Sequence, residues 1–420
     1  MHYDTFKSVI ENKLLTHIPA LISVWRTNSS SNKAQLSHDE IQHVSKALLS
    51  LQRGLTGDRQ LAGAGYMDDS AMLGAYLLYY WPVSYMQMSY ALCDCKEQIQ
   101  KIINSKEESE IKILDLGCGP APASIAVVDS LLRNNTSTKK LSIGITLVDS
   151  SEKAMALAKK IGNTEYSSVH VDAIKTNFEK DGVSLIDKII KSDKYDVIVM
   201  CHALNELWKD GSEESVNRRS EFINEVSKYL DSDGFILICE PALLSTSRNL
   251  LAVRDLLIKK ELSIVAPCPC NAESNVCPAL VAGPNHTCHA EIDWQPKEPV
   301  QSLAKAAGLD RESVKMTYIV LQHKKINDIG ASKSDHIEKV SGRIVSEGML
   351  NKAGRIRYLI CNGKNRIAVS AKNQDAHAKQ IGFFSLKRLD LIEIENPEIR
   401  GDKQTVAYGI GPATKLQIKD

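Results

Sequence analysis

The chain has 420 residues, 43% of them hydrophobic and 25% charged, which is the composition of an ordinary globular protein with two or three domains. No apolar run reaches the roughly 18–20 residues that cross a bilayer, so we expect no membrane partner. The N-terminal residues resemble neither a secretory signal nor an Arg-rich transit peptide. We therefore expect a reducing cytoplasm, in which clustered cysteines more often bind metal than form disulfides, and we expect a monomer.

The net charge of +1 conceals an uneven distribution. Residues 324–420 carry 18 Lys and Arg against 11 Asp and Glu, so this segment is basic and the rest of the chain is acidic. A basic segment on an acidic body favours a module that faces a polyanion. The alternative is a solvated surface that happens to be basic, because the segment lacks a dense basic stripe.

Residues 1–105 are predicted to be helical, because apolar residues recur at helical spacing in 6–25 and 39–55. The polar stretch 27–40 is predicted to be a loop between these two helices. The tyrosine-rich segment 73–92 would form an aromatic helix, and we expect its rings to belong to the core.

From residue 111 the pattern changes to short apolar runs that alternate with helical segments. The runs are 111–117, 142–149, 168–173, 195–204 and 234–242. This alternation predicts an α/β domain over residues 106–324, built on a doubly wound, mostly parallel sheet. A polar linker at 326–335 is then followed by strand-like runs separated by Gly and Asn, which predict a small β-rich domain over 336–420.

A nucleotide site is predicted where the first strand ends, because Asp115, Gly117 and Gly119 follow it in the spacing D-x-G-x-G. The acidic residue disfavours a pyrophosphate and suits an amino-bearing ligand such as S-adenosylmethionine (SAM). Asp149 ends the second strand, where it can accept hydrogen bonds from both ribose hydroxyls, and Asp172 ends the third, where it could meet the adenine amino group. Either aspartate alone could be a helix cap. The ordered series resembles the class I SAM-dependent, Rossmann-like methyltransferase pattern.

The fourth strand ends in CHALNELW, residues 201–208, at the sheet edge where the reactive methyl group would point. This segment lacks the Asn or Asp before Pro-Pro-aromatic with which amino-group methyltransferases often orient their target. Cys201 is better explained as a structural thiol than as a nucleophile. Asn205 is a candidate cofactor-pocket residue, although it could instead cap the next helix with Glu206. No catalytic residue is identified.

A cysteine-rich loop at residues 266–289 is a candidate metal site. It places Cys268, Cys270, Cys277 and Cys288 among Pro, Gly and Asn, on irregular backbone that can fold around a metal. The spacing is not the paired C-x-x-C of zinc ribbons, and wide spacing suits an iron–sulfur cluster. The C-x-C spacing makes binding by both Cys268 and Cys270 less favourable. The alternative is a loop of free thiols.

The chain resembles the methyltransferase-like family of small-ribosomal-subunit assembly proteins, which is found in mitochondria and bacteria. The resemblance is carried by LQRGLTGDRQLAG (51–63), YYWPVSY (79–85), LDLGCGPAPAS (114–124), LNEL (204–207), APCPC (266–270), CPAL (277–280) and CH (288–289). It implies a class I methyltransferase fold with bound SAM and a [4Fe–4S] cluster. The implied cluster ligands are Cys268, Cys277, Cys288 and, from the β-rich part, Cys361. Cys270 stands where relatives can have His and is treated as a spare.

Three functions follow as hypotheses. The first is an assembly factor that binds small-subunit ribosomal RNA and ribosomal proteins, with SAM and the cluster as structural or sensing elements. The second is an active methyltransferase of that RNA. The third is a small-molecule methyltransferase with a zinc-stapled lid. Docking on 16S-type rRNA is expected through Arg343, Lys352, Arg355, Arg357, Lys364, Arg366, Lys387 and Arg388, with Arg53 and Arg59 as a second contact.

Overall fold

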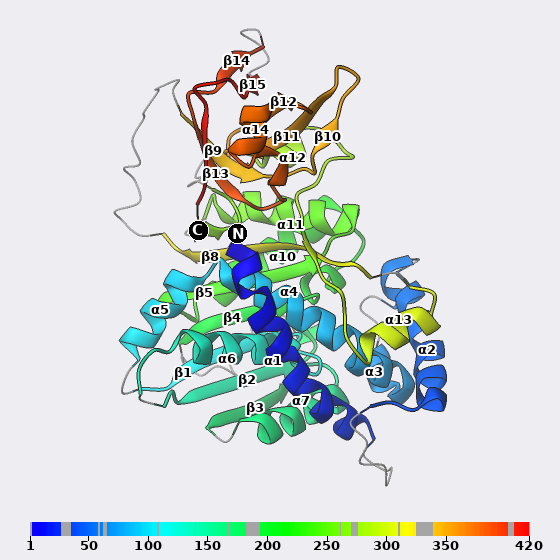
Figure 1. Ribbon diagram of the computed structural model, residues 1–420. Helices are drawn as coiled ribbons and strands as arrows, with labels where there is room; N and C mark the ends of the chain where they lie inside the picture. The colour runs from blue at the N-terminus through cyan, green and yellow to red at the C-terminus, as the bar shows by residue number, and fades with distance from the viewer. Residues whose placement is uncertain are drawn as a thin grey trace.

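The computed structural model contains two β-sheets, one above the other, with helices packed around the lower sheet (Figure 1). It describes the whole chain except residues 1, 27–34, 58, 62–64, 107–108, 139, 167, 182–193, 261, 270–275, 310, 325–338, 402–406 and 420. The predicted linker at 326–335, residues 27–34 of the predicted polar loop and Cys270 therefore lie outside the described residues.

The first sheet has the strand order β3-β2-β1-β4-β5-β8-β6, with β7 paired to β8. Its strands are β1 (Ile111–Leu116), β2 (Ile143–Asp149), β3 (Val169–Lys175), β4 (Tyr195–Cys201), β5 (Leu230–Pro241), β6 (Leu262–Ala266), β7 (Ala290–Asp293) and β8 (Ser313–His323). Strands β1 to β5 pair in parallel, whereas β8 runs antiparallel to both β5 and β6. The predicted mostly parallel, doubly wound sheet is confirmed, while the direction of β8 had no signal in the sequence.

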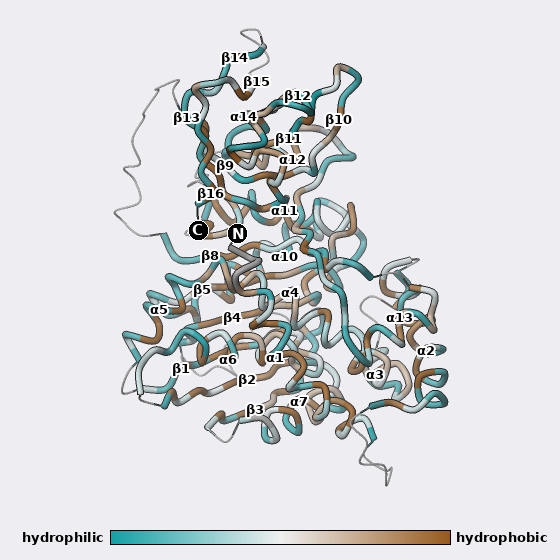
Figure 2. The backbone as a smooth tube through the Cα atoms, in the orientation of Figure 1, coloured by the Kyte–Doolittle hydropathy of each residue, from teal (hydrophilic) through white to brown (hydrophobic). Residues whose placement is uncertain are grey.

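Helices cover both faces of this sheet, so its central strands are continuous apolar runs. In β4, Val197 and Val199 share a hydrophobic cluster with the N-terminal helices, α6 (Pro122–Asn134) and α7 (Glu152–Glu165). Ile198 and Met200 share another with α10 (Glu213–Ser227) and α11 (Leu244–Leu257). Figure 2 shows this strand as a hydrophobic, brown segment at the centre of the sheet. The helices of this part are α6 (Pro122–Asn134), α7 (Glu152–Glu165), α8 (Phe178–Asp181), α10 (Glu213–Ser227), α11 (Leu244–Leu257), α12 (Pro278–Val281) and α13 (Val300–Ala306).

The N-terminal region is helical, as predicted. It contains α1 (His2–Trp25), α2 (His38–Gln52), η1 (Arg53–Gly57), η2 (Tyr66–Asp68), α3 (Ser70–Ala75), η3 (Tyr76–Tyr80), α4 (Trp81–Cys93) and α5 (Lys96–Ser105). Every residue of η3 and α4 is buried, which confirms the tyrosine-rich segment as core. Trp81 donates its indole N–H to the carbonyl oxygen of Pro120 over 2.9 Å, and this bond fixes α4 to the loop after β1. No helix among the described residues is both long enough and apolar enough to cross a membrane.

The buried carboxylate of Asp129, on α6, joins four segments of the chain. The ring Nε2 of His17 on α1 and the hydroxyl of Tyr85 on α4 each lie 2.7 Å from its Oδ2, and the Tyr166 hydroxyl donates to its Oδ1. Lys13 adds an ion pair at 3.4 Å. Burial opposes ionisation of Asp129, but the bonds from His17 and the two tyrosines outweigh it and hold its pKa below the ordinary value.

The second sheet forms a β-rich C-terminal body with the order β14-β15-β12-β11-β9-β13-β16, and β10 pairs with β11. Its elements are β9 (Lys339–Ile344), β10 (Met349–Leu350), β11 (Arg355–Cys361), β12 (Arg366–Lys372), α14 (Ala376–Gln380), η6 (Phe383–Ser385), β13 (Leu391–Glu395), β14 (Glu398–Arg400), β15 (Ala407–Gly409) and β16 (Lys415–Lys419). It has its own hydrophobic core, in which Tyr358, Ile360, Val369, Phe383 and Ile392 are buried.

Polar contacts dock this body on the first sheet. The carboxylate of Asp94, just after α4, accepts a hydrogen bond from the Tyr318 hydroxyl of β8 at 2.6 Å and pairs with Arg343 of β9 at 3.1 Å. The Arg366 guanidinium of β12 donates to the carbonyl oxygen of Thr287 over 2.5 Å. Both arginine contacts lie next to the loop that carries the clustered cysteines.

Replacing Asp129 with Ala should lower the free energy of unfolding by about 3–5 kcal/mol, because the buried partners of this carboxylate lose their acceptor. Urea denaturation followed by circular dichroism measures the change. Ser130→Ala, a substitution of the neighbouring buried residue, is the matched control and should cost about 1 kcal/mol or less. Equal denaturation midpoints for the two variants would contradict the assigned role of Asp129.

Candidate functional site: a cofactor cavity and a cysteine-lined cavity

A cavity of about 290 Å³ opens at the carboxyl edge of the first sheet, and Gly117, Gly119 and Asp149 line it. We call it the cofactor cavity, because it lies where the sequence predicts the SAM site. Both glycines have left-handed backbones, with φ of 70° and 51°. A Cβ on Gly117 would lie 2.4 Å from the Cβ of Ala203, in the loop after β4. Glycine at this position therefore allows the loops after β1 and β4 to approach each other.

Asp149 is the last residue of β2, and its carboxylate is held by backbone groups on the cavity wall. Its Oδ2 accepts the N–H of Gly119 and its Oδ1 accepts the N–H of Ser151, each over 2.8 Å. Burial raises the pKa of this carboxyl above its ordinary value, and the two backbone N–H groups oppose that shift. Each carboxylate oxygen keeps further acceptor capacity, so the side chain is able to bind two hydroxyl donors of a ribose.

Asp115 lies beneath the glycine loop instead of on the cavity wall. It is fully buried, and its Oδ2 accepts hydrogen bonds from the Ser124 hydroxyl at 2.6 Å and the Ser124 N–H at 3.2 Å. Burial raises its pKa to about 7. Asp115 thus supports the turn from β1 into α6, which differs from the direct cofactor contact that the D-x-G-x-G spacing predicted.

Asp172 lies on β3, away from the cavity. The strand continues to Lys175, and the Asp172 side chain is 67% exposed, 3.3 Å from the ring of His170. Thr176 and Asn177 follow the end of the strand and line the cavity. The prediction that Asp172 ends the third strand is therefore wrong, because the apolar run stops before the strand does.

Asn205, on η4 (Leu204–Glu206), lies in the wall of a second chamber of about 530 Å³. Its Oδ1 accepts a hydrogen bond from the Arg59 guanidinium at 2.7 Å, and its Nδ2 donates to the carbonyl oxygen of His202 at 2.8 Å. Asn205 therefore positions the loop after β4. The second chamber adjoins the cofactor cavity, and the two share Tyr66, Tyr76, His202 and Glu206 as walls.

Several residues of the cofactor cavity come from the N-terminal region and were missed by the sequence analysis, among them Tyr66 and Asp68. Asp68 accepts a hydrogen bond from the Ser151 hydroxyl at 2.8 Å. The Tyr66 hydroxyl lies 3.3 Å from Oε1 of Glu206. They stand far before the glycine loop in the sequence, in a helical region, so no local spacing connects them with a nucleotide site.

The four cysteines implied as cluster ligands all line one cavity where the two sheets meet. Cys268 follows β6, Cys277 precedes α12, Cys288 precedes β7, and Cys361 is the last residue of β11. Burial, with a further contribution from the other thiols, raises the pKa of Cys288 to about 12 and that of Cys361 to about 11. These two thiols are therefore neutral when no metal is bound, and each loses its proton only when its sulfur binds a metal.

A buried cation accompanies the thiols. The guanidinium of Arg254, on α11, is fully buried at the same cavity and ion-paired with Asp255. Burial opposes its charge, but Cys268 and Asp255 outweigh this effect and raise its pKa. Asp255 also accepts the N–H of Cys277 over 2.9 Å. A buried arginine beside four thiols suits an anionic, thiolate-bound group, and no motif in the sequence indicated it.

The three cysteines of the loop lack the paired C-x-x-C spacing of zinc ribbons, and the fourth comes from a different sheet. A cubane takes one thiolate on each of its four irons, so four ligands from separate segments suit it. Among the described residues, the one group of three or more potential ligands with ligand atoms mutually within 4.8 Å is Cys201, His202 and Cys239.

The predicted rRNA-binding residues fall into two groups. Arg343, Arg355, Arg366 and Arg388 donate to backbone carbonyl oxygens at 2.5–2.9 Å, and Arg59 binds Asn205, so these guanidinium groups serve the fold. Lys352, Arg357, Lys364 and Lys387 are exposed on the C-terminal body, and Arg53 is exposed on η1. Of the predicted rRNA-binding residues, those of the second group therefore have side chains exposed to a polyanion.

The strand order, the glycine loop after β1 and the carboxylate that ends β2 together define a class I SAM-dependent methyltransferase fold. The chain belongs to the mitochondrial small ribosomal subunit Rsm22 family, whose family model matches residues 70–378. None of the curated proteins compared with the chain matches it.

Solved structures similar to the chain include several methyltransferases. A Listeria monocytogenes protein assigned to the class I SAM-dependent methyltransferases is 12% identical, with 77% of this chain and 91% of that chain covered and a TM-score of 0.35. Loganic acid methyltransferase with SAH is 10% identical, with coverages of 59% and 97% and a TM-score of 0.32. The plantazolicin methyltransferase BpumL with SAH is 11% identical, with coverages of 68% and 98% and a TM-score of 0.29.

Asp149→Ala should weaken SAM binding by about 1–3 kcal/mol, because the ribose hydroxyls lose a charged acceptor. Isothermal titration calorimetry on the full chain measures the affinity. Asp172→Ala is the matched control. It also removes a carboxylate, but an exposed one on the neighbouring strand β3 and away from the cavity, so this variant should bind SAM as the wild type does. Wild-type affinity in Asp149→Ala would overturn the assignment of this cavity to SAM.

Proposed function

We propose that the protein is an assembly or maturation factor for the small ribosomal subunit. It binds ribosomal RNA and holds SAM and a [4Fe–4S] cluster as structural or sensing elements. The observation that carries this proposal is the convergence of Cys268, Cys277, Cys288 and Cys361 on one cavity between the two sheets. The chain belongs to a family whose description is mitochondrial small ribosomal subunit Rsm22, and this membership supports the small ribosomal subunit as the partner.

The proposed cluster would be held by three thiolates of the loop and one of the C-terminal body, each on one iron. Arg254 would offset part of its negative charge from within the protein. A group bound in this way fastens the C-terminal body to the methyltransferase-like part, alongside the contacts of Arg343 and Arg366.

A second candidate, methyl transfer to a base of that RNA, is favoured by the second chamber. This chamber shares a wall with the cofactor cavity and carries Tyr66, Tyr76 and Tyr80, on which a planar base stacks well. Mapping of modified nucleosides in small-subunit rRNA, with and without the protein, separates the two candidates. A nucleoside modified only in the presence of the protein establishes the enzyme, and an unchanged map with impaired subunit assembly establishes the assembly factor.

The third hypothesis, a small-molecule methyltransferase with a zinc-stapled lid, has less support. It requires the cavity thiols to bind one zinc ion, although their positions in the chain lack the paired C-x-x-C spacing of zinc ribbons. It also assigns no role to the exposed cations of the C-terminal body. Absence of RNA binding by the intact protein would favour it.

Protein purified anaerobically should contain about four irons and about four labile sulfides, because a cubane needs both. Changing Cys268, Cys277, Cys288 or Cys361 to Ser should abolish iron binding in each case, whereas Cys270→Ser should keep most of the iron. Cys118→Ser, at a buried cysteine outside the cavity, is the control and should keep all of it. Zinc in place of iron and sulfide, lost with the same four substitutions, would overturn the cluster.

A triple variant with Lys352, Arg357 and Lys364 changed to Glu should bind small-subunit rRNA more weakly. Each phosphate contact that is lost reduces the number of counterions released on binding. The magnitude of the slope of log affinity against log salt should therefore fall by about 0.7–0.9 per contact. The matched control reverses the exposed Lys96 and Lys101 on α5 and Lys160 on α7, outside the C-terminal body, with the same total charge change. Equal losses in both variants would show a non-specific charge effect and would contradict docking through the C-terminal body.

A further inference from the structure

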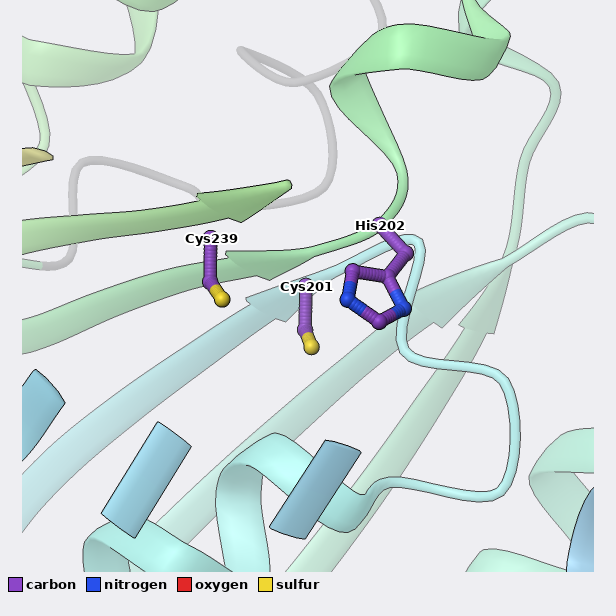
Figure 3. Close-up of side chains that lie close together, drawn as sticks. All are labelled: Cys201, His202 and Cys239. Carbon is purple, nitrogen blue, oxygen red and sulfur yellow. The ribbon is translucent and has the colours of Figure 1, made fainter. Parts of the chain in front are cut away.

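Three potential metal ligands meet at the carboxyl ends of β4 and β5, outside the cysteine-lined cavity. Cys201 is the last residue of β4, and Cys239 is its register partner on the parallel strand β5. Both side chains lie on the face of the sheet that the N-terminal helices cover. Figure 3 shows the two thiols side by side and the imidazole of His202 next to Cys201. The ligand atoms of all three residues lie within 4.8 Å of one another.

The backbone holds the imidazole in this place. The N–H of His202 donates to the carbonyl oxygen of Cys239 over 2.8 Å, which extends the pairing of the two strands by one residue. His202 has a φ of 60°, a left-handed conformation that non-glycine residues adopt at a cost. Residues with such strain are concentrated at ligand and active sites.

One potential ligand atom of the group has no hydrogen-bond partner among the described residues. This atom is the buried Nε2 of His202. A buried ring nitrogen without a partner has lost the hydrogen bond that it makes with water in the unfolded chain, and this loss costs free energy. A metal ion that binds the lone pair of the nitrogen would offset this cost. Figure 3 shows a ring nitrogen on the edge of the imidazole that faces the thiols.

We propose that Cys201, Cys239 and His202 bind one thiophilic metal ion, with zinc as the leading candidate. Two thiolates and one imidazole are a common donor set for zinc, whose bonds of about 2.3 Å to sulfur and about 2.0 Å to nitrogen hold such ligands about 4 Å apart. On binding, the two thiols release their protons to solvent and the imidazole binds in its neutral form. Two thiolates then balance the charge of a divalent ion, which suits a buried site.

The fourth position of this ion faces the cofactor cavity. Cys201 and His202 both line that cavity, and His202 also lines the second chamber, whereas Cys239 is fully buried behind them. Three protein ligands with one open position are typical of zinc sites that bind water or a substrate atom. The site would therefore present a Lewis-acidic position to a small molecule at the boundary between the two cavities. This site is separate from the proposed cluster, because none of Cys201, His202 and Cys239 lines the cysteine-lined cavity.

Zinc titration of the anaerobic, iron-loaded full chain tests the proposal, with metal analysis and X-ray absorption at the zinc edge as readouts. We expect about one zinc per chain, with two sulfurs at about 2.3 Å and one imidazole nitrogen at about 2.0 Å. Cys239→Ala should reduce the bound zinc at least tenfold and leave the iron content unchanged. Cys118→Ala, at another buried cysteine of the same sheet edge, is the matched control and should keep the zinc.

His202→Asn provides a second variant if Cys239→Ala does not fold, because Asn tolerates the left-handed backbone and removes the imidazole. It should also lose the zinc. Several results would overturn the proposal: no zinc bound by the wild type, a zinc shell of sulfur alone, zinc lost with Cys268→Ser but kept in Cys239→Ala, or a Cys201–Cys239 disulfide in place of metal. The zinc proposal does not depend on the iron–sulfur cluster. A chain that binds no iron but keeps zinc on two sulfurs and one imidazole nitrogen would refute the cluster and leave the zinc site in place.

Discussion

The buried carboxylate of Asp129 is the interaction on which the arrangement of the N-terminal helices depends. It binds His17 of α1, Tyr85 of α4 and Tyr166 after α7, so one charge on α6 orders three other segments. Helix α4 continues directly from η3, whose tyrosines form walls of both cavities. The N-terminal helices are therefore a structural part of the site, and the sheet alone would leave both cavities open on that side.

The predictable part of the fold is the part that repeats locally. Apolar runs and helical periodicity gave the parallel strands, and the tyrosine-rich segment was recognised as core because it has no polar face. The end of β3 was misplaced because this edge strand is only partly buried, so its last residues, Ala173 to Lys175, lack a strong apolar pattern. Asp115 was assigned to the ligand because the motif specifies its position in the chain but not which way its side chain points.

The site contains residues that no local pattern could have identified. Cys361 was connected to the cysteine loop only through a family resemblance, because nothing in its own strand marks it as a ligand. Arg254 lies within an ordinary amphipathic helix, and its role appears only when the thiols surround it. Cys201 and Cys239 lie far apart in the sequence, and strand pairing alone brings them together. The cytoplasmic location stays a prediction.

The separation of Cys288 from Cys361 along the chain has a further consequence. A group bound to both closes a loop of roughly 70 residues and removes many conformations from the unfolded chain. By the relation used for covalent cross-links, such a closure is worth about 4 kcal/mol. Such a closure would also require the synthesis of β11, since Cys361 is the last residue of this strand. A nascent or truncated chain that ends before β11 would lack one of the four proposed ligands, so metal content would report that synthesis has passed this point.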